Sequence, residues 1–271
     1  MTLLAWCGEP LDKHLLGTMK TYKKIESRAS EVFLNRLSQY TRISNIFRDY
    51  VKFATRLAIG MHDIGKAHPN YLLWNRHRLH LECDKPRKYN CESYCKPHIP
   101  KFIMHEVLSG CIVMRYLNRL PLISEIGESQ SAISLELMMS LAVAYHHEAI
   151  RTPLNYKVEE QLSSFGSWNP LEYEEAGIIV RRITEEALDG ISFGPTLDEI
   201  LDEFSGARIM FSETLKAWRA PGKPIVKLYA LVCGPLMICD NLVAFRNRGG
   251  RAPTSFVEEA LRGLPELGVE R

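Results

Sequence analysis

The sequence has very little net charge, and this limits what the chain as a whole can attract. Its 34 Lys and Arg residues are nearly balanced by 32 Asp and Glu residues, so the formal net charge at pH 7 is +2. Such a chain has no strong overall attraction to nucleic-acid phosphates, because that attraction requires an excess of cations. Any binding of nucleic acid must therefore come from local patches.

Long apolar runs are also missing. No uninterrupted apolar stretch reaches the length needed to cross a bilayer, and the N-terminus lacks the basic region and apolar core of a signal peptide. These absences lead us to expect a cytoplasmic protein with no membrane partner. The chain also has no GxxxxGK(S/T) phosphate loop, which argues against a motor domain.

The cysteines do not form the pattern of a disulfide-rich protein. There are 7 of them, an odd number, and Cys111, Cys233 and Cys239 stand in apolar helical contexts. Buried thiols fit these three positions better than a complete disulfide framework.

What the sequence does contain is helical periodicity over most of its length. Apolar residues recur at the three-and-four spacing of amphipathic helices, and 46% of the 271 residues are hydrophobic. We therefore predict an all-α fold in a single domain over 1–271, with no clear strand alternation. A kink or a break is expected near Gly234, just before Pro235. The predicted helices cover 11–26, 29–40, 44–63, 103–118, 130–147, 170–188, 196–217 and 224–247.

The segment from Met61 to Lys66 is the most informative part of the chain. His62 and Asp63 place a borderline and a hard metal ligand side by side at the last turn of a predicted helix. Gly65 can adopt the left-handed conformation that closes a helix, which would aim both side chains at one point. The alternative is an Asp that only orients its neighbouring His.

Other candidate ligands recur on apolar, helix-like segments. An unpaired polar group in an apolar setting costs roughly 1 to 3 kcal/mol, so buried imidazoles need partners, and a shared metal would satisfy them together. Separately hydrogen-bonded core histidines are the alternative. Asp240 interrupts a strongly apolar helix, and buried Asp is rare unless it is paired or bound to metal. The histidines in question are His14, His105, His146 and His147.

This ordered set resembles the HD superfamily of metal-dependent phosphohydrolases. More narrowly, it is similar to the HD nuclease of type I CRISPR interference, in a stand-alone form without the helicase. The match spans residues 14 to 240. The strings that carry it are Lys13-His14-Leu15, His62-Asp63-Ile64-Gly65-Lys66-Ala67, His105-Glu106 with Ser109, Tyr145-His146-His147, and Asp240.

The resemblance implies an HD-domain helical bundle with one or two divalent ions that degrades single-stranded DNA or RNA in CRISPR antiviral defence. It implies one ion held by His14, His62, Asp63 and Asp240. A second ion would be held by Asp63, His105, His146 and His147, so that Asp63 bridges the two. A separate CRISPR helicase and a guide-RNA surveillance complex would be its partners.

The chemistry of the ligand set bears on the ion and on the neighbouring lysine. Mixed His and carboxylate ligands suit Mn, Fe, Co, Ni or Zn more naturally than Mg, which prefers oxygen. Lys66 follows Asp63 by three residues and could place its ammonium beside the scissile phosphate. An ordinary solvated lysine is the alternative. Asp63 and Lys66 are thus the candidate catalytic residues.

Two basic segments are candidates for binding nucleic acid. One is an insertion over 76–101 that interleaves cations with Tyr89 and Tyr94, which could stack on unpaired bases. The other follows Asp240. A solvated loop is the alternative for both. The cations we single out are Arg76, Arg78, Arg87, Lys88, Arg246 and Arg248.

The same insertion contains four potential zinc ligands, Cys83, Cys91, Cys95 and His98. Their spacing departs from the usual paired CxxC knuckles, so a structural zinc, a disulfide and free thiols all stay open. For the whole chain, the leading hypothesis is a metal-dependent nuclease. The alternatives are an HD phosphohydrolase of nucleotides or cyclic nucleotides, and a nucleic-acid-binding subunit without turnover.

Overall fold

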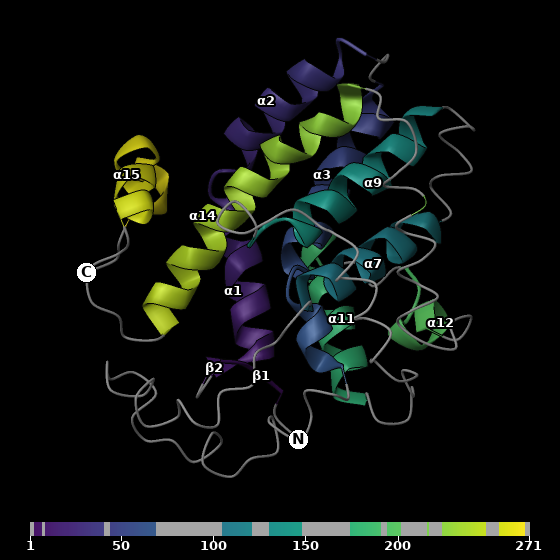
Figure 1. Cartoon of the computed structure of the whole chain (residues 1–271), viewed down its shortest axis with the longest axis vertical. Helices are drawn as coiled ribbons and strands as arrows, with labels where there is room; N and C mark the ends of the chain where they lie inside the picture. Colours follow the sequence, from purple (N-terminus) through teal and green to yellow (C-terminus); the bar gives the residue numbers. More distant parts are fainter. Residues whose placement is uncertain are drawn as a thin grey trace.

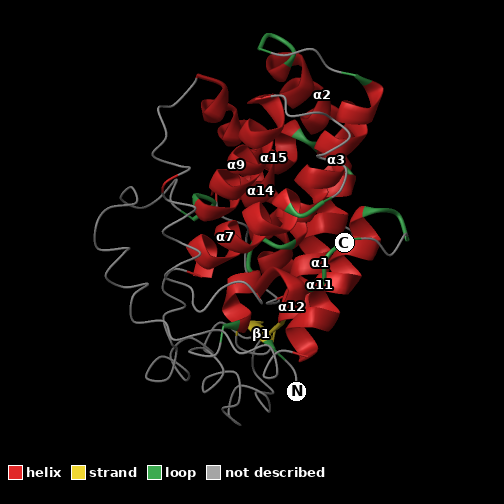
Figure 2. Cartoon of the chain, turned by 90° about the vertical axis from the view of Figure 1, so that its right-hand side faces the viewer, coloured by secondary structure: helices red, strands yellow, loops and turns green. Residues whose placement is uncertain are grey.

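A computed structural model describes residues 3–6, 9–40, 44–68, 105–120, 130–147, 174–190, 194–201, 216, 224–247 and 255–268. These residues are mostly α-helical, with one small two-stranded sheet, which confirms the predicted all-α class (Figure 2). The basic insertion over 76–101, with its Cys and His residues, lies outside the described residues.

The predicted helices have counterparts, with ends that differ by a few residues. A helix was predicted to run on to residue 26, but one helix ends at Lys23 and the next begins at Glu26. Of the helix predicted over 196–217, a short helix and Lys216 are described. The α-helices are α1 (Leu11–Lys23), α2 (Glu26–Leu37), α3 (Asn45–Gly60), α7 (His105–Asn118), α9 (Gln130–Ala144), α11 (Glu174–Ala187), α12 (Leu197–Leu201), α14 (Ala230–Asn247) and α15 (Ser255–Gly263).

Several short elements were not predicted. Strands β1 (Leu4–Trp6) and β2 (Glu9–Pro10) pair antiparallel just before α1. The sequence showed no clear strand alternation, and segments as short as these carry none that a pattern could reveal. Single 3-10 helices follow α3, precede α14 and follow α15. These are η1 (Ile64–Ala67), η4 (Pro224–Tyr229) and η5 (Pro265–Leu267).

The core forms where five helices meet. α1 packs on α14 and α3, α7 packs on α9, and α9 also contacts α3 and α14 (Figure 1). α3 packs into this core through one apolar face, whose residues recur every three or four positions. They are all buried: Phe47, Val51, Ala54 and Ala58. The helix begins where the Ser44 hydroxyl accepts a hydrogen bond from the Phe47 N–H at 3.1 Å, a typical N-cap.

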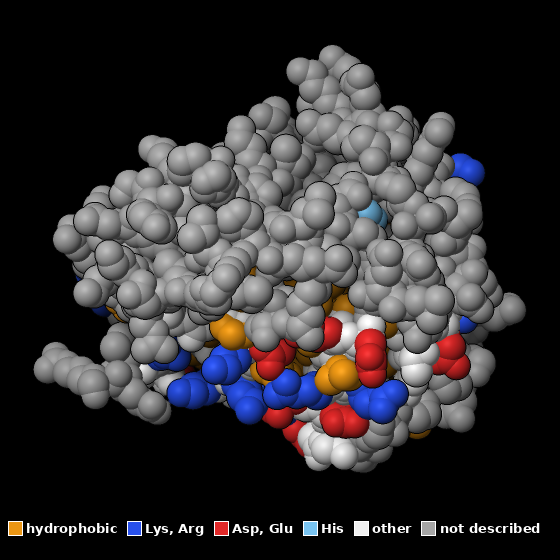
Figure 3. Space-filling view, turned by 90° about the horizontal axis from the view of Figure 1, so that it is seen from below, with side chains coloured by type: hydrophobic (Ala, Val, Ile, Leu, Met, Phe, Trp, Pro, Cys, Tyr) orange, Lys and Arg blue, Asp and Glu red, His pale blue; other side chains and the backbone are white. Residues whose placement is uncertain are grey.

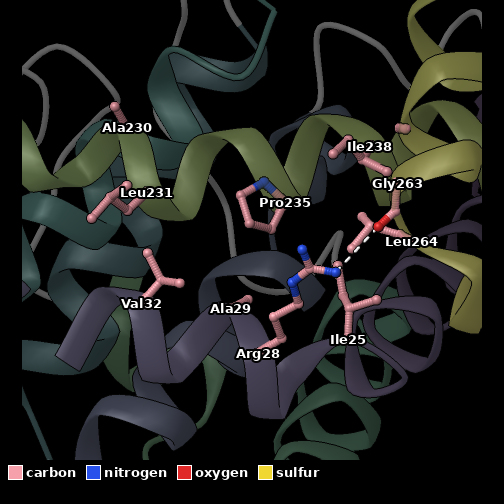
Figure 4. Close-up of a pocket in the computed structure, with 11 residues that line it drawn as sticks. Ile25, Arg28, Ala29, Val32, Ala230, Leu231, Pro235, Ile238, Gly263 and Leu264 are labelled. Atoms are coloured by element: carbon pink, nitrogen blue, oxygen red, sulfur yellow. Dashed lines mark hydrogen bonds between the residues drawn. The ribbon is translucent and has the colours of Figure 1, made fainter. Parts of the chain in front are cut away.

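Of the kink or break expected near Gly234, the break is wrong, because α14 is continuous from Ala230 to Asn247 with Pro235 inside it. Pro235 has no N–H to donate to the carbonyl oxygen of Leu231, four residues earlier, so α14 continues without that one hydrogen bond. Its ring also lines an apolar groove of about 370 Å³ between α2, α14 and α15, where it faces Arg28 and Ala29 (Figure 4).

One described segment, Lys227–Asn247, is long and apolar enough to cross a membrane by length and composition alone. It includes α14, which packs against α1, α2 and α9. Its Asp240 is buried and contacts His14. This is the setting of a core helix, and it is compatible with a soluble protein. The described cysteines Cys111, Cys233 and Cys239 are buried thiols, as predicted.

Candidate metal centre

The structure brings all seven predicted ligands together at one place in the core. They come from five different helices or helix ends, so the fold itself assembles the cluster. His14 lies on α1, His62 and Asp63 follow α3, His105 opens α7, His146 and His147 follow α9, and Asp240 lies on α14.

Asp63 lies at the centre, and its two carboxylate oxygens face different histidines. Oδ1 lies 2.9 Å from the Nε2 of His105 and 3.6 Å from the Nε2 of His146. Oδ2 lies 3.5 Å from the Nε2 of His14 and 3.7 Å from the Nε2 of His62. One carboxylate therefore joins two groups of imidazoles.

The remaining two predicted ligands complete these groups. Asp240 Oδ1 lies 3.0 Å from the Nε2 of His14 and 3.6 Å from the Nε2 of His62. The Nε2 of His147 lies 4.0 Å from Asp63 Oδ1. We call His14, His62 and Asp240, around Oδ2 of Asp63, the first half of the centre. The second half is His105, His146 and His147, around Oδ1 of Asp63.

The two halves adjoin closely. Ligand atoms of His62, His146 and Asp240 also lie within 4.8 Å of one another, so His146 borders both halves. The rings of His62 and His146 meet edge to face, with centroids 5.0 Å apart. The seven side chains therefore form one continuous polar cluster within the apolar core.

The other nitrogen of four imidazoles is held away from the centre. The Nδ1–H groups of His62 and His146 donate to the carbonyl oxygens of Ile59 and Val143, each three residues earlier. The Nδ1–H of His14 donates to Glu9 Oε1 at 2.8 Å. His105 Nδ1 pairs with Glu106 Oε2 at 3.1 Å. In each of these rings Nδ1 is engaged away from the centre, so Nε2 is the nitrogen that would face a cation.

Buried polar atoms in the cluster provide a test of whether a cation fits. The Nε2 atoms of His62 and His146 are buried and have no hydrogen bond within the described part of the chain. An orphaned buried polar group is costly, and a metal ion would satisfy both atoms together with the Asp63 carboxylate. The donor set of imidazoles and carboxylates therefore fits a divalent ion.

The carboxylates of the cluster are ionised. Burial alone would raise the pKa of Asp63, but Lys66, His62 and His105 together hold it well below its ordinary value. Burial likewise opposes ionisation of Asp240, yet the neighbouring His14 and His62 hold its pKa well below the usual range. The cluster thus supplies the anionic groups that a divalent cation requires.

The surroundings shift the pKa values of the imidazoles in different directions. Burial would lower the pKa of His14, but its bonds to Asp240, Asp63 and Glu9 raise it well above its ordinary value. Burial lowers the pKa of His62. Burial and repulsion from His146 and His105 lower the pKa of His147 to about 2. His147 is thus neutral, as a metal ligand must be.

The turn that carries Asp63 differs from its prediction. α3 ends at Gly60, so His62 and Asp63 lie in the following turn rather than in the helix. Gly65 does not adopt a left-handed conformation; among the described glycines only Gly190 and Gly194 have positive φ.

Close packing is what requires glycine at position 65. A Cβ there would lie 2.2 Å from the carbonyl oxygen of His105 and 2.9 Å from Leu108 Cβ. The Gly65 N–H donates to the Ser109 hydroxyl at 2.8 Å. Because residue 65 has no side chain, η1 packs closely against α7. This packing of η1 on α7 sets the position of Asp63 relative to His105.

Lys66 is not a solvated lysine, which removes the alternative considered for it. Only 6% of the residue is exposed, and its ammonium contacts Asp63 Oδ2 at 2.5 Å. Burial of a lysine is rare without such a partner. Lys66 therefore places a fixed positive charge at the edge of the cluster, on the side of the first half.

Sequence reasoning missed Glu9. It is buried on β2, and its Oε1 accepts hydrogen bonds from both His14 and the Asn247 amide. The one available signal was an acidic residue five positions before His14, directly ahead of the proline that caps α1.

Of the cations that we singled out as candidates for binding nucleic acid, Arg246 is the one that lies in the described part of the chain. The Arg246 guanidinium donates to the carbonyl oxygens of Leu267 and Gly268, so it holds the C-terminal segment. Arg248 lies outside the described residues, as do the insertion cations. On the face seen in Figure 3, the described Lys and Arg side chains are interspersed with Asp and Glu.

No known family model and no curated protein sequence matches this chain. The interpretation of the site therefore depends on its residues and their geometry.

Proposed function

We propose that this chain is a metal-dependent phosphodiesterase of the HD type that acts as a nuclease on single-stranded nucleic acid. The observation that carries the proposal is the position of Asp63, whose two oxygens face separate groups of buried imidazoles. A carboxylate placed in this way suits a bridge between two divalent ions, and two-metal sites are typical of enzymes that hydrolyse phosphate esters.

The residues of the chain would bind and orient. His14, His62 and Asp240 would hold one ion, His105, His146 and His147 the other, and Asp63 both. Two bound divalent ions supply an acidified water as nucleophile and stabilise charge on the phosphate oxygens. The helix ends fix the imidazoles through their Nδ1–H bonds, so the ligand atoms need little reorganisation.

Lys66 has a separate role in this proposal. Its ammonium is buried beside Asp63, where it would offset the negative charge that develops on a phosphate in the transition state. A buried cation acts more strongly than a solvated one, because little water screens its charge. Lys66 would therefore stabilise the reacting group without being a metal ligand.

The substrate and partners belong to the same proposal. The basic insertion over 76–101 and the adjacent His146-His147 pair favour a polymer over a free nucleotide. A stand-alone nuclease of this kind would work in the cytoplasm with a separate CRISPR helicase and guide-RNA surveillance complex. The ligand set favours Mn, Fe, Co or Ni over Mg.

Cleavage of labelled single-stranded DNA and RNA by the purified chain tests the proposal. Reactions would contain Mn²⁺, Mg²⁺, Co²⁺ or Ni²⁺, with EDTA as the metal-free control, and nucleotide hydrolysis would be followed in parallel. Asp63→Asn removes the bridging charge at constant size. Asp49→Asn is the matched control, because Asp49 is an exposed carboxylate of α3.

We expect metal-dependent cutting that is lost in Asp63→Asn and kept in Asp49→Asn. Nucleotide turnover without polymer cutting would contradict the nuclease and support the HD phosphohydrolase instead. Metal-independent binding of DNA with no turnover of either substrate would contradict an enzyme of any kind and support a binding subunit.

A further inference from the structure

The small N-terminal sheet places a buried carboxylate directly behind the first half of the metal centre. Glu9, on β2, is only 3% exposed, although nothing in the proposed ligand set includes it. A buried glutamate is uncommon without a partner, and Glu9 lies at hydrogen-bond distance from two polar groups. Its position therefore calls for a role.

One partner of Glu9 is a proposed ligand. Oε1 of Glu9 accepts the Nδ1–H of His14 at 2.8 Å, while the opposite ring nitrogen faces Asp240 at 3.0 Å. This hydrogen bond fixes the tautomer and the orientation of the His14 ring. It also makes Nε2 more basic, and a more basic nitrogen binds a cation more tightly.

The other partner of Glu9 belongs to the helix that carries Asp240. The same Oε1 accepts a hydrogen bond from the Asn247 amide at 2.8 Å. Asn247 is the last residue of α14, and Asp240 lies seven residues earlier, which is about two helical turns and thus the same helix face. Glu9 therefore ties His14 on α1 and the end of α14 to one point.

We propose that Glu9, braced by Asn247, is a positioning residue that prepares the first half of the centre for its ion. The inference depends on the proposed function, because it assumes that this half holds a divalent cation. It assigns a role to the two-residue strand β2, which holds the carboxylate beside α1. Glu106 is the counterpart in the second half, where it pairs with His105.

The test is a titration of the full metal-free chain with cobalt(II) chloride, followed by the visible absorption of bound Co²⁺ and by calorimetry. The variants are Glu9→Ala, Glu9→Gln and Asn247→Ala. Glu31→Gln is the matched control, because Glu31 is an exposed carboxylate on α2. Thermal unfolding in EDTA records whether each variant folds.

The first half has two carboxylates, Asp63 and Asp240, so we expect its ion to be the tighter of the two. Glu9→Ala should raise the Kd of that Co²⁺ by about 10- to 100-fold, the usual effect of removing a residue that supports a histidine ligand. Glu9→Gln keeps an oxygen that can accept the His14 Nδ1–H, so its loss is smaller than that of Glu9→Ala. Asn247→Ala gives the smallest loss, and since Asn247 is exposed it also tests the inference if Glu9→Ala does not fold.

An unchanged Kd in Glu9→Gln and Asn247→Ala, or an equal loss in Glu31→Gln, would overturn the inference while leaving the proposed function intact. A wild-type chain that binds no Co²⁺ would overturn both. A loss confined to the weaker Co²⁺ would also contradict the assignment, because it would place the effect in the second half.

Discussion

The two halves of the metal centre are built from the same kinds of contact but differ in one ligand. Each half has one histidine supported by a glutamate, His14 by Glu9 and His105 by Glu106. Each also has one histidine that donates to the carbonyl oxygen three residues earlier. The first half is completed by Asp240, whereas the second is completed by His147.

This one difference changes charge and access together. The side chain of Asp240 is 10% exposed, while that of His147 is 34% exposed. The first half is therefore enclosed and has two carboxylates, including Asp63. The second half is open on the His147 side and has only the shared carboxylate. We infer that the first half binds its ion more tightly and that the second half exchanges its ion more readily.

Removing Lys66 gives the largest expected effect of these variants. Its ammonium lies on the Oδ2 side of Asp63, so this charge also belongs to one half of the centre and not to the other. Lys66→Ala should lower the turnover of single-stranded DNA by about 10²- to 10³-fold, as loss of a charge-stabilising donor does. Metal content should stay near the wild-type value. Cleavage rates and metal analysis of the same samples measure both. Loss of metal would mean that Lys66 is structural.

Replacing the one ligand that distinguishes each half, Asp240 or His147, tests the comparison directly. A charge-assisted contact contributes about 1.5 to 3 kcal/mol, which corresponds to roughly a 10- to 150-fold change in affinity. Asp240→Asn should therefore weaken the tighter ion by that factor, and His147→Ala should weaken only the looser one. Calorimetric titration with Mn²⁺ measures each step. If both variants weaken the same step, the halves are not distinct.

Substitution of Gly65 should act mainly on the second half, since this glycine sets how η1 lies against His105. Gly65→Ala forces a shift that costs about 1 to 3 kcal/mol of unfolding free energy, as overpacking does. Urea unfolding measures that cost, and Mn²⁺ titration should show a weaker second step. Gly177→Ala is the control: nothing lies within 4 Å of a Cβ there, and it should stabilise α11 slightly.

The smallest expected effect concerns a buried carboxylate outside the centre. No cation of the described residues faces it, and its pKa is raised, whereas the pKa values of Asp63 and Asp240 are lowered. Glu136 on α9 accepts a hydrogen bond from the Tyr50 hydroxyl at 2.8 Å, and burial raises its pKa from 4.5 to about 7. The folded chain therefore keeps a proton that the unfolded chain loses. This contribution to stability is complete below pH 4.5 and disappears as the pH rises through about 7.

Glu136→Gln should remove that pH dependence. One pKa unit corresponds to about 1.4 kcal/mol, and the core relaxes around a charge, so we expect the variant to be about 1 kcal/mol more stable than wild type at pH 8. Urea unfolding at pH 5 and pH 8 measures the difference. If the free energy of unfolding changed equally between pH 5 and pH 8 in both proteins, Glu136 would be ionised in the folded chain.

Sequence reasoning reached the ligands but not their supports. Apolar periodicity located α1, α3, α7, α9 and α14, and the ligands were recognisable because each is polar at the end or in the middle of an apolar helix. Glu9 was missed because a two-residue strand has no periodicity. The reason given for Gly65 was wrong because a contact between η1 and α7 is long-range, and a local pattern cannot reveal it.

The measurement that most directly tests the central claim is electron paramagnetic resonance of the chain loaded with Mn²⁺. Two ions that share the Asp63 carboxylate should give an exchange-coupled signal, and Asp63→Asn should abolish it while Asp49→Asn keeps it. A single bound ion, or two ions with only isolated Mn²⁺ signals in the wild-type chain, would contradict a centre bridged by Asp63.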